Sequence, residues 1–126
     1  MNQTTVTGFR LKLYPKDFAK ARAFYEQTLG FVVINEWDRG EHDRGVMLQV
    51  GPAIIELLTP ETNYTPVAGA DLSLEVPDVR ALWQDLKDRT DVVFVLRDND
   101  WGDSSFCVND PERFEITFFT PQEQQK

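Results

Sequence analysis

The chain has 126 residues, 41% of them hydrophobic and 27% charged, which is typical of one globular domain with a substantial core. Its formal net charge of −8 disfavours nucleic acid and anionic membranes as partners, because both are polyanions. We expect no signal peptide, no membrane span and a cytoplasmic location, because the start is polar and no apolar run nears the roughly 20 residues of a span. A single cysteine, Cys107, fits a reducing compartment and is expected to be a buried, unreactive side chain.

Apolar and polar residues alternate from Val6 to Tyr14, which predicts a strand with one covered and one polar face. The covered face would carry Phe9, Leu11 and Leu13, and the polar face Arg10, Lys12 and Tyr14. Asp17 is the expected N-cap of a helix that ends at Gly30. Its buried residues, at helical spacing, would be Phe18, Ala21, Phe24, Tyr25 and Leu29.

Three further strands are predicted in the first half, at Phe31–Trp37, Val46–Val50 and Ala53–Leu58. Gly51-Pro52 between the last two indicates a hairpin. The charged segment 38–45 reads as a turn, and we expect its His42, the only histidine, to be a solvated surface residue.

The second half repeats this order after a proline-containing linker, residues 60–69. We predict a strand at Asp71–Val76 and a helix capped by Asp78, with Val79, Leu82, Trp83 and Leu86 on its apolar face. Strands follow at Val92–Leu96, Ser104–Val108 and Phe114–Phe119, with a loop at Arg97–Gly102 and a frayed polar tail at Gln122–Lys126.

The two halves are related by a constant offset of 61 residues, which matches Leu11 with Leu72 and Asp17 with Asp78. An internal repeat of this length predicts two like modules in one domain, with any site at their junction. The expected fold class is therefore α+β, with βαβββ modules at 5–59 and 70–120 inside a single domain, 1–126.

Two strings carry a family resemblance: Asp17 followed by Ala23-Phe24-Tyr25-Glu26-Gln27-Thr28-Leu29-Gly30-Phe31, and Trp101-Gly102-Asp103-Ser104-Ser105-Phe106 followed by Asp110-Pro111. In this combination the chain resembles the vicinal oxygen chelate superfamily, which includes glyoxalase I, bleomycin-resistance proteins, fosfomycin-resistance enzymes and extradiol dioxygenases. The resemblance implies a curved mixed sheet around a cavity, helices on the outside, and a homodimer. It also implies that Arg10, Lys12 and Tyr14, like Asp71, Ser73 and Glu75, face the cavity.

Metal-dependent members of this superfamily carry His, Gln or Glu on the first strand of each module and Glu on a last strand. The corresponding positions here hold Arg10, Glu56, Asp71 and Thr117. Guanidinium has no acceptor and cannot ligate a cation, so we predict that no metal or other cofactor is bound. Arg10 would instead pair with Glu56 and Asp71, either as a structural ion pair or as an anchor for a ligand's carboxylate, phosphate or carbonyl. If the last strand shifted by two residues, Glu115 would replace Thr117, and Glu56, Asp71 and Glu115 could hold a divalent metal ion.

Aromatic residues supply the remaining site candidates. The resemblance implies that Trp37 and Trp101 stack against a planar ligand. The alternative for Trp101 is that it packs its loop onto the sheet. Tyr14 could offer its phenol to a ligand or have a structural use, whereas Phe106 is expected in the core or the cavity wall. No Ser/His/Asp triad, phosphate-binding glycine loop or dinucleotide fingerprint is present in the sequence.

The sequence therefore predicts a metal-free small-molecule-binding protein of the glyoxalase/bleomycin-resistance type. Its acidic surface is compatible with a cationic drug. One alternative is a divalent-metal-dependent lyase, isomerase or dioxygenase, and another is metal-free acid/base chemistry with Glu56 or Asp71 as base and Arg10 steadying an oxyanion. The predicted ligand-binding residues are Arg10, Lys12, Tyr14, Trp37, Glu56, Asp71, Trp101 and Thr117.

Overall fold

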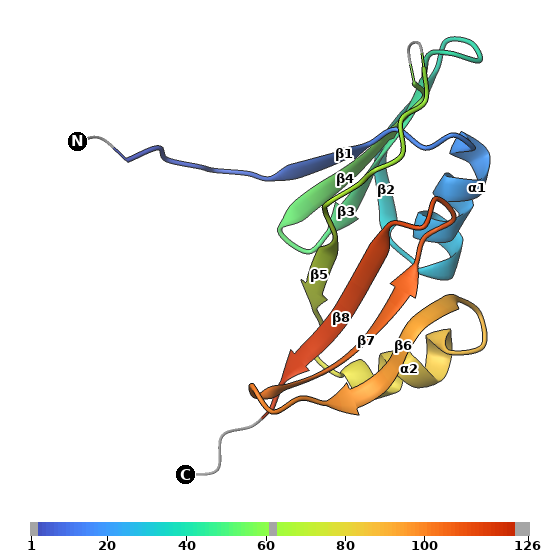
Figure 1. Cartoon of the computed structure of the whole chain (residues 1–126). Helices are drawn as coiled ribbons and strands as arrows, with labels where there is room; N and C mark the ends of the chain where they lie inside the picture. Colours follow the sequence, from blue (N-terminus) through green and yellow to red (C-terminus); the bar gives the residue numbers. More distant parts are fainter. Residues whose placement is uncertain (1–2, 61–62, 123–126) are drawn as a thin grey trace. The chain divides into compact units, whose positions relative to one another are not determined.

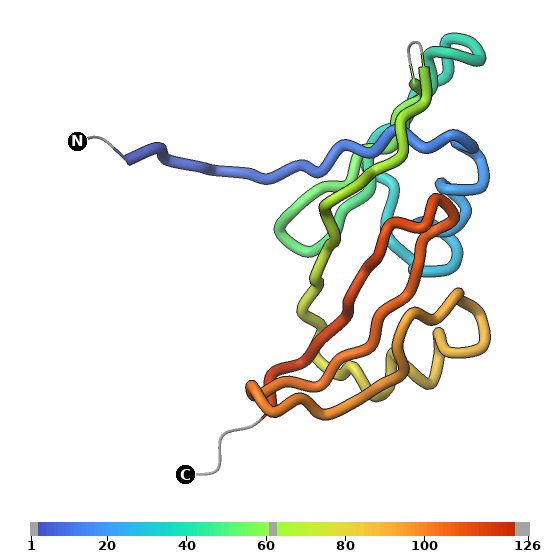
Figure 2. The backbone as a smooth tube through the Cα atoms, in the orientation of Figure 1, coloured from blue at the N-terminus to red at the C-terminus, as the bar shows by residue number. Residues whose placement is uncertain are grey.

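A computed structural model describes residues 3–60 and 63–122 of the chain. The chain divides into two compact units, residues 1–66 (unit one) and 67–126 (unit two), each with its own sheet and helix. Figure 1 shows the elements of both units, and Figure 2 follows the backbone through them. The units are described one at a time below.

Unit one is a four-stranded mixed sheet with a helical segment. Its sheet order is β1-β4-β3-β2, in which β1 runs parallel to β4 and the other neighbours are antiparallel. The elements are β1 (Arg10–Leu13), α1 (Phe18–Ala23), η1 (Phe24–Thr28), β2 (Val32–Asp38), β3 (Arg44–Val50) and β4 (Ala53–Leu58). The predicted β-strands of this half are all present, although β3 begins earlier than expected because Arg44 and Gly45 pair with the end of β2.

The helical segment of unit one begins where the sequence predicts. The carboxylate of Asp17 accepts a hydrogen bond from the backbone N–H of Lys20 at 3.1 Å, as an N-cap does. The segment is not one regular helix, because α1 passes into a single wider π-helical turn, η1. Its end at Gly30 is confirmed, and the φ of +77° at Gly30 suits glycine.

The two faces of the unit-one sheet differ. The face toward α1 and η1 is apolar, and Leu48 and Leu57 on the sheet and Tyr25 of η1 are fully buried. Because side chains alternate along a strand, the opposite face carries the other residues of each strand. We call this the open face of unit one, and it is formed by Arg10, Lys12, Trp37, Gly45, Met47, Ile54 and Glu56.

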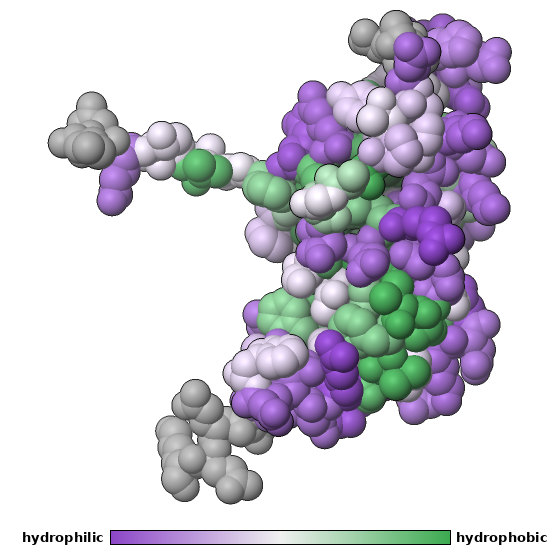
Figure 3. Space-filling view, in the orientation of Figure 1, coloured by the Kyte–Doolittle hydropathy of each residue, from purple (hydrophilic) through white to green (hydrophobic). Residues whose placement is uncertain are grey.

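The first strand is shorter than predicted. Pairing in β1 begins at Arg10, opposite Ile54, and residues 3–9 are exposed and extend away from the sheet (Figures 1 and 2). The expectation that Phe9 is covered is wrong, since 63% of it is exposed. The carbonyl of Phe9 still accepts a hydrogen bond from the N–H of Ile54 at 3.1 Å, but β4 starts at Ala53, so no strand of the unit continues past this point beside residues 3–8. This segment adds apolar surface that Figure 3 shows in green.

Unit two has the same topology. Its strands follow the order β5-β8-β7-β6, again with one parallel pair, and the carboxylate of Asp78 caps the helix by accepting from the N–H of Ala81. Its elements are β5 (Leu72–Glu75), α2 (Val79–Leu86), β6 (Asp91–Asp98), β7 (Asp103–Asn109) and β8 (Glu115–Pro121). The α+β fold class with two βαβββ modules is therefore confirmed.

The core of unit two centres on Phe106. This side chain is fully buried, and its ring lies 5.1 Å from the ring of Trp83 and 5.3 Å from that of Phe118. Phe106 is thus core, and Trp83 of α2 is half-buried against it. The predicted loop at Arg97–Gly102 is shorter in the structure because β6 continues to Asp98. Most of the predicted tail, residues 123–126, lies outside the described residues.

Strand pairing confirms the internal repeat at residue level. Leu11 faces Ile55 in the parallel pair of unit one, and Leu72 faces Ile116 in that of unit two. Leu72 and Ile116 each lie 61 residues after their counterparts Leu11 and Ile55. By the same offset, Glu56 and Thr117 occupy equivalent positions. The expected register of the last strand is therefore the observed one, and Glu115 lies on the same face as Thr117, two residues before it.

Candidate functional site

An ion pair lies on the open face of unit one. The guanidinium Nη1 of Arg10, on β1, is 3.1 Å from Oε1 of Glu56, on β4. The Glu56 side chain is only 8% exposed, whereas that of Arg10 is 47% exposed. A buried carboxylate needs a compensating charge, and Arg10 supplies it while part of its guanidinium remains at the surface. This half of the predicted Arg10 pairing is confirmed.

Two predicted site residues lie on the same strand as Arg10 or just beyond it. Lys12 is exposed and faces Glu56 in the parallel register, so a second cation stands beside the ion pair. Tyr14 follows the end of β1 and is 46% exposed. Both side chains can therefore be reached from solvent.

Trp37 lies flat against a glycine on the open face. Trp37 and Gly45 are directly paired across β2 and β3, and a Cβ placed on Gly45 would come 2.1 Å from the indole. The guanidinium carbon of Arg39 lies 5.9 Å from the indole centroid. The absence of a side chain at Gly45 therefore sets the height of the indole above the sheet. Chain order alone could not reveal this contact, because it depends on the strand register.

We expect Gly45→Ala to displace this indole. The added methyl group overlaps ring atoms, and such overpacking costs about 1–3 kcal/mol of stability. Urea unfolding would measure the loss, and the indole N–H resonance of Trp37 would report the displacement. Gly8→Ala is the matched control, because a Cβ at Gly8 meets nothing within 4 Å. If the two variants lose the same stability and leave the Trp37 resonance equally unchanged, the contact between Trp37 and Gly45 is contradicted.

In unit two, the predicted site residues gather around a thiol. Thr117 of β8 is paired with Ser73 on one side and Cys107 on the other. Burial raises the pKa of the Cys107 thiol, a hydrogen bond with Thr117 opposes this, and the charges of Glu115 and Asp71 raise it further. The thiol therefore stays protonated at neutral pH, which agrees with an unreactive cysteine. Its neighbours also show that Asp71, Glu115 and Thr117 share one region of unit two.

A divalent metal ion does not fit the unit-one positions. The carboxylate that would ligate it, Glu56, is already paired with Arg10, and a guanidinium offers no lone pair to a cation. Throughout residues 3–60 and 63–122, no group of three or more His, Cys, Asp or Glu side chains is arranged to hold a metal ion. Pairing of Asp71 with Arg10 stays a prediction, because these residues belong to different units.

Trp101 is held at the tip of the β6–β7 hairpin. The turn is closed by Gly102 N–H donating to the carbonyl of Asn99 at 3.1 Å, and Gly102 has a φ of +108°. The buried amide of Asn99 donates to Asp103 Oδ1 and Ser105 Oγ, both at 2.8 Å. Trp101 is nonetheless 72% exposed, so the alternative that it packs the loop onto the sheet is wrong. Sequence reasoning missed Asn99, although an Asn followed by Gly three residues later is a turn signal.

His42 is exposed in the turn between β2 and β3, as expected. Sequence reasoning also missed Arg44, which begins β3 and lies over the ring of Phe18, with 5.2 Å between the guanidinium carbon and the ring centroid. No motif marks this arginine, and only the packing of α1 against β3 brings it into view. Among the described residues, none of the helices is long and apolar enough to cross a membrane.

Solved structures share this fold. TnmS3, an antibiotic binding protein from Streptomyces sp. CB03234, aligns over 96% of this chain and 100% of its own with 22% identity and a TM-score of 0.72. TioX from Micromonospora sp. ML1 aligns over 94% and 98%, with 21% identity and a TM-score of 0.72. A glyoxalase/bleomycin resistance protein/dioxygenase from Nocardioides aligns over 99% and 89%, with 14% identity and a TM-score of 0.74.

No curated protein sequence matches the chain. A family model, in contrast, matches residues 5–118, which include every element from β1 to β7 and the first half of β8. The strand-by-strand repeat and the site positions described above all lie within this range. The chain belongs to the Glyoxalase/Bleomycin resistance protein/Dioxygenase superfamily.

Proposed function

We propose that this protein binds a small organic molecule without a metal ion, using the open face of unit one. The observation that carries this proposal is the ion pair between Arg10 and Glu56. It occupies positions at which metal-dependent members of the superfamily would place ligands. A fixed cation there replaces the attraction that a divalent ion would exert on a ligand oxygen.

The chemistry of the open face supports this proposal. Guanidinium has five N–H donors, and Glu56 accepts from one of them in the ion pair. Because Arg10 is half-exposed, its other donors are available to a carbonyl, carboxylate or phosphate oxygen of a ligand. Lys12 adds a second positive charge, and Trp37 adds a flat apolar surface against which a planar ring can stack.

The similarity to TnmS3, an antibiotic binding protein, supports an antibiotic-like small molecule as the ligand. In unit two, Trp101 would offer a stacking surface of its own, since its turn is well hydrogen-bonded and its side chain is exposed. The proposal includes a homodimer and a cytoplasmic location. Sedimentation equilibrium on the purified chain would test the dimer.

Ligand binding and metal content can be tested together. The protein, purified without chelators, is analysed for bound elements and titrated with a panel of aromatic antibiotics, with and without EDTA. We expect substoichiometric metal, binding that EDTA does not change, and loss of binding in Arg10→Met. Arg89→Met, which removes an exposed ion pair with Asp85, is the matched control and should bind as the wild type does. Absence of binding across the panel, or equal loss in both variants, would contradict the proposal.

A metal-dependent lyase, isomerase or dioxygenase remains the second candidate. Its support is that Asp71 and Glu115 line the same surface pocket of unit two. A stoichiometric ion that disappears in Glu56→Gln and Glu115→Gln would favour this enzyme over the binding protein.

A further inference from the structure

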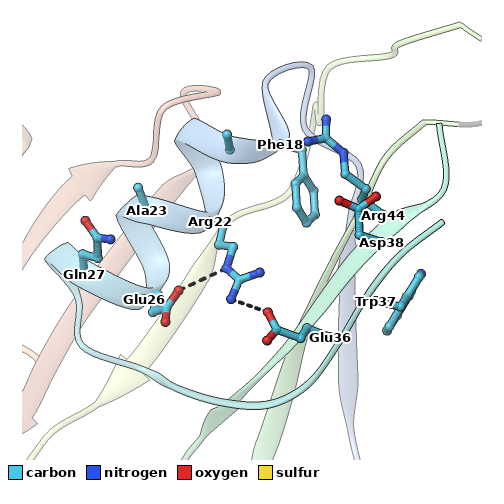
Figure 4. Close-up of a pocket in the computed structure, with 10 residues that line it drawn as sticks. Phe18, Arg22, Ala23, Glu26, Gln27, Glu36, Trp37, Asp38 and Arg44 are labelled. Carbon is cyan, nitrogen blue, oxygen red and sulfur yellow. Dashed lines mark hydrogen bonds and ion pairs between the residues drawn. The ribbon is translucent and has the colours of Figure 1, made fainter. Parts of the chain in front are cut away.

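A pocket lies on the face of the unit-one sheet that carries the helix. It has a volume of about 530 Å³ and is bounded by α1, η1 and the ends of β2 and β3 (Figure 4). Apolar walls come from Phe18, Ala19 and Ala23, and Gln27 adds an amide. This face carries the helix, so Arg10, Lys12 and Glu56 of the open face do not line the pocket, although Trp37 borders it.

One of the two arginines in this pocket is fully engaged. Arg22 donates from Nε to Glu26 at 3.1 Å and pairs through Nη2 with Glu36 at 2.5 Å (Figure 4). Burial lowers the pKa of this guanidinium, but hydrogen bonds to the two carboxylates outweigh the burial, and the net shift is upward. Arg22 is therefore held by both acids, and its single positive charge balances only one of their two negative charges.

The other arginine, Arg44, has no such partner. The remaining arginines of unit one, Arg10, Arg22 and Arg39, each form an ion pair, whereas Arg44 pairs with no carboxylate of the described residues. Its Nε is buried and lacks a hydrogen-bond acceptor. Its guanidinium lies beside the Phe18 ring at the edge of the pocket (Figure 4). A buried donor without an acceptor is unfavourable, so the protein itself leaves this guanidinium incompletely satisfied.

We propose that this pocket binds small organic monocarboxylates with an aromatic or branched apolar body, through the guanidinium of Arg44. The planar guanidinium carries paired N–H donors that match the two oxygens of a carboxylate. The apolar part of the ligand lies against Phe18, Ala19 and Ala23. A single negative charge suits the site better than a phosphate dianion, because Asp38 also lines the pocket and repels the second charge.

Benzoate is a suitable probe, and benzamide is its uncharged isostere. Titrated into the ¹⁵N-labelled full chain, benzoate should shift amide signals of α1, β2 and the start of β3, whereas benzamide should shift them little. Arg44→Gln should weaken benzoate binding about ten- to a hundredfold, the usual effect of losing a charged hydrogen-bonded pair. Arg44→Lys should recover only part of the affinity, because an ammonium cannot bind both oxygens side by side.

Arg39→Gln is the matched control, because it removes the same charge from the same hairpin, and it should bind benzoate as the wild type does. Ala19→Leu keeps Arg44 but fills pocket volume from an exposed helical position, and it should also weaken binding. The proposal is overturned if benzoate and benzamide produce equal shifts, if Arg44→Gln and Arg39→Gln lose affinity equally, or if Ala19→Leu binds normally. These variants leave Arg10 of the open face unchanged, so binding there is tested separately by Arg10→Met.

Discussion

Replacing Arg10 with methionine should lower the free energy of unfolding by about 1–3 kcal/mol. The variant leaves the buried Glu56 carboxylate without its 3.1 Å partner, and an uncompensated buried charge is costly. The larger loss of stability seen when a fully buried ion pair is broken does not apply here. Arg10 is half-exposed, and water partly screens its interaction with Glu56. Urea unfolding followed by circular dichroism would measure the change.

A second substitution separates this cause from lost packing of the arginine stem. Glu56→Gln in the Arg10→Met background removes the stranded charge and should recover most of the stability. Arg89→Met, at an exposed pair, should change stability by no more than about 0.5 kcal/mol. If Arg10→Met behaves like Arg89→Met, the ion pair has no structural role, and an anchor for a ligand is then its only remaining explanation.

Replacing Phe106 with alanine should have the largest effect on stability, about 3–5 kcal/mol. The side chain is fully buried between Trp83 and Phe118, so its removal loses apolar burial and leaves a cavity. Thermal unfolding and urea titration would both measure it. Trp101→Ala removes an even larger aromatic ring from the same unit, but at a position that is 72% exposed.

Trp101→Ala should therefore leave the unfolding midpoint within the range of ordinary surface changes, about 0.5 kcal/mol. It should instead reduce affinity in the ligand titrations if the indole stacks on a ligand. A large loss of stability in Trp101→Ala would show that this side chain packs in solution, contrary to its exposure in the structure.

Much of the fold follows from local chemistry that the sequence displays directly. Alternation predicts the strands, Asp17 and Asp78 cap the helices that follow, and Gly30 ends the first. These signals depend on neighbouring residues, so one chain is enough to reveal them. The internal repeat also predicts the strand register, because equivalent positions in two like modules pair in equivalent ways. The positions of Glu56 and Thr117 could be derived in this manner.

Tertiary structure decided the rest of the candidate site. Whether Phe9 is covered depends on where β4 begins, and whether Trp37 lies flat depends on Gly45 standing opposite it. The exposure of Trp101 and the lack of a partner for Arg44 likewise depend on contacts between distant residues. Sequence by itself determined the family and the repeat, and it predicted that Arg10 stands where relatives place a metal ligand. Partners and exposure came only from the packed structure, because they are properties of the space around a side chain and not of its order along the chain.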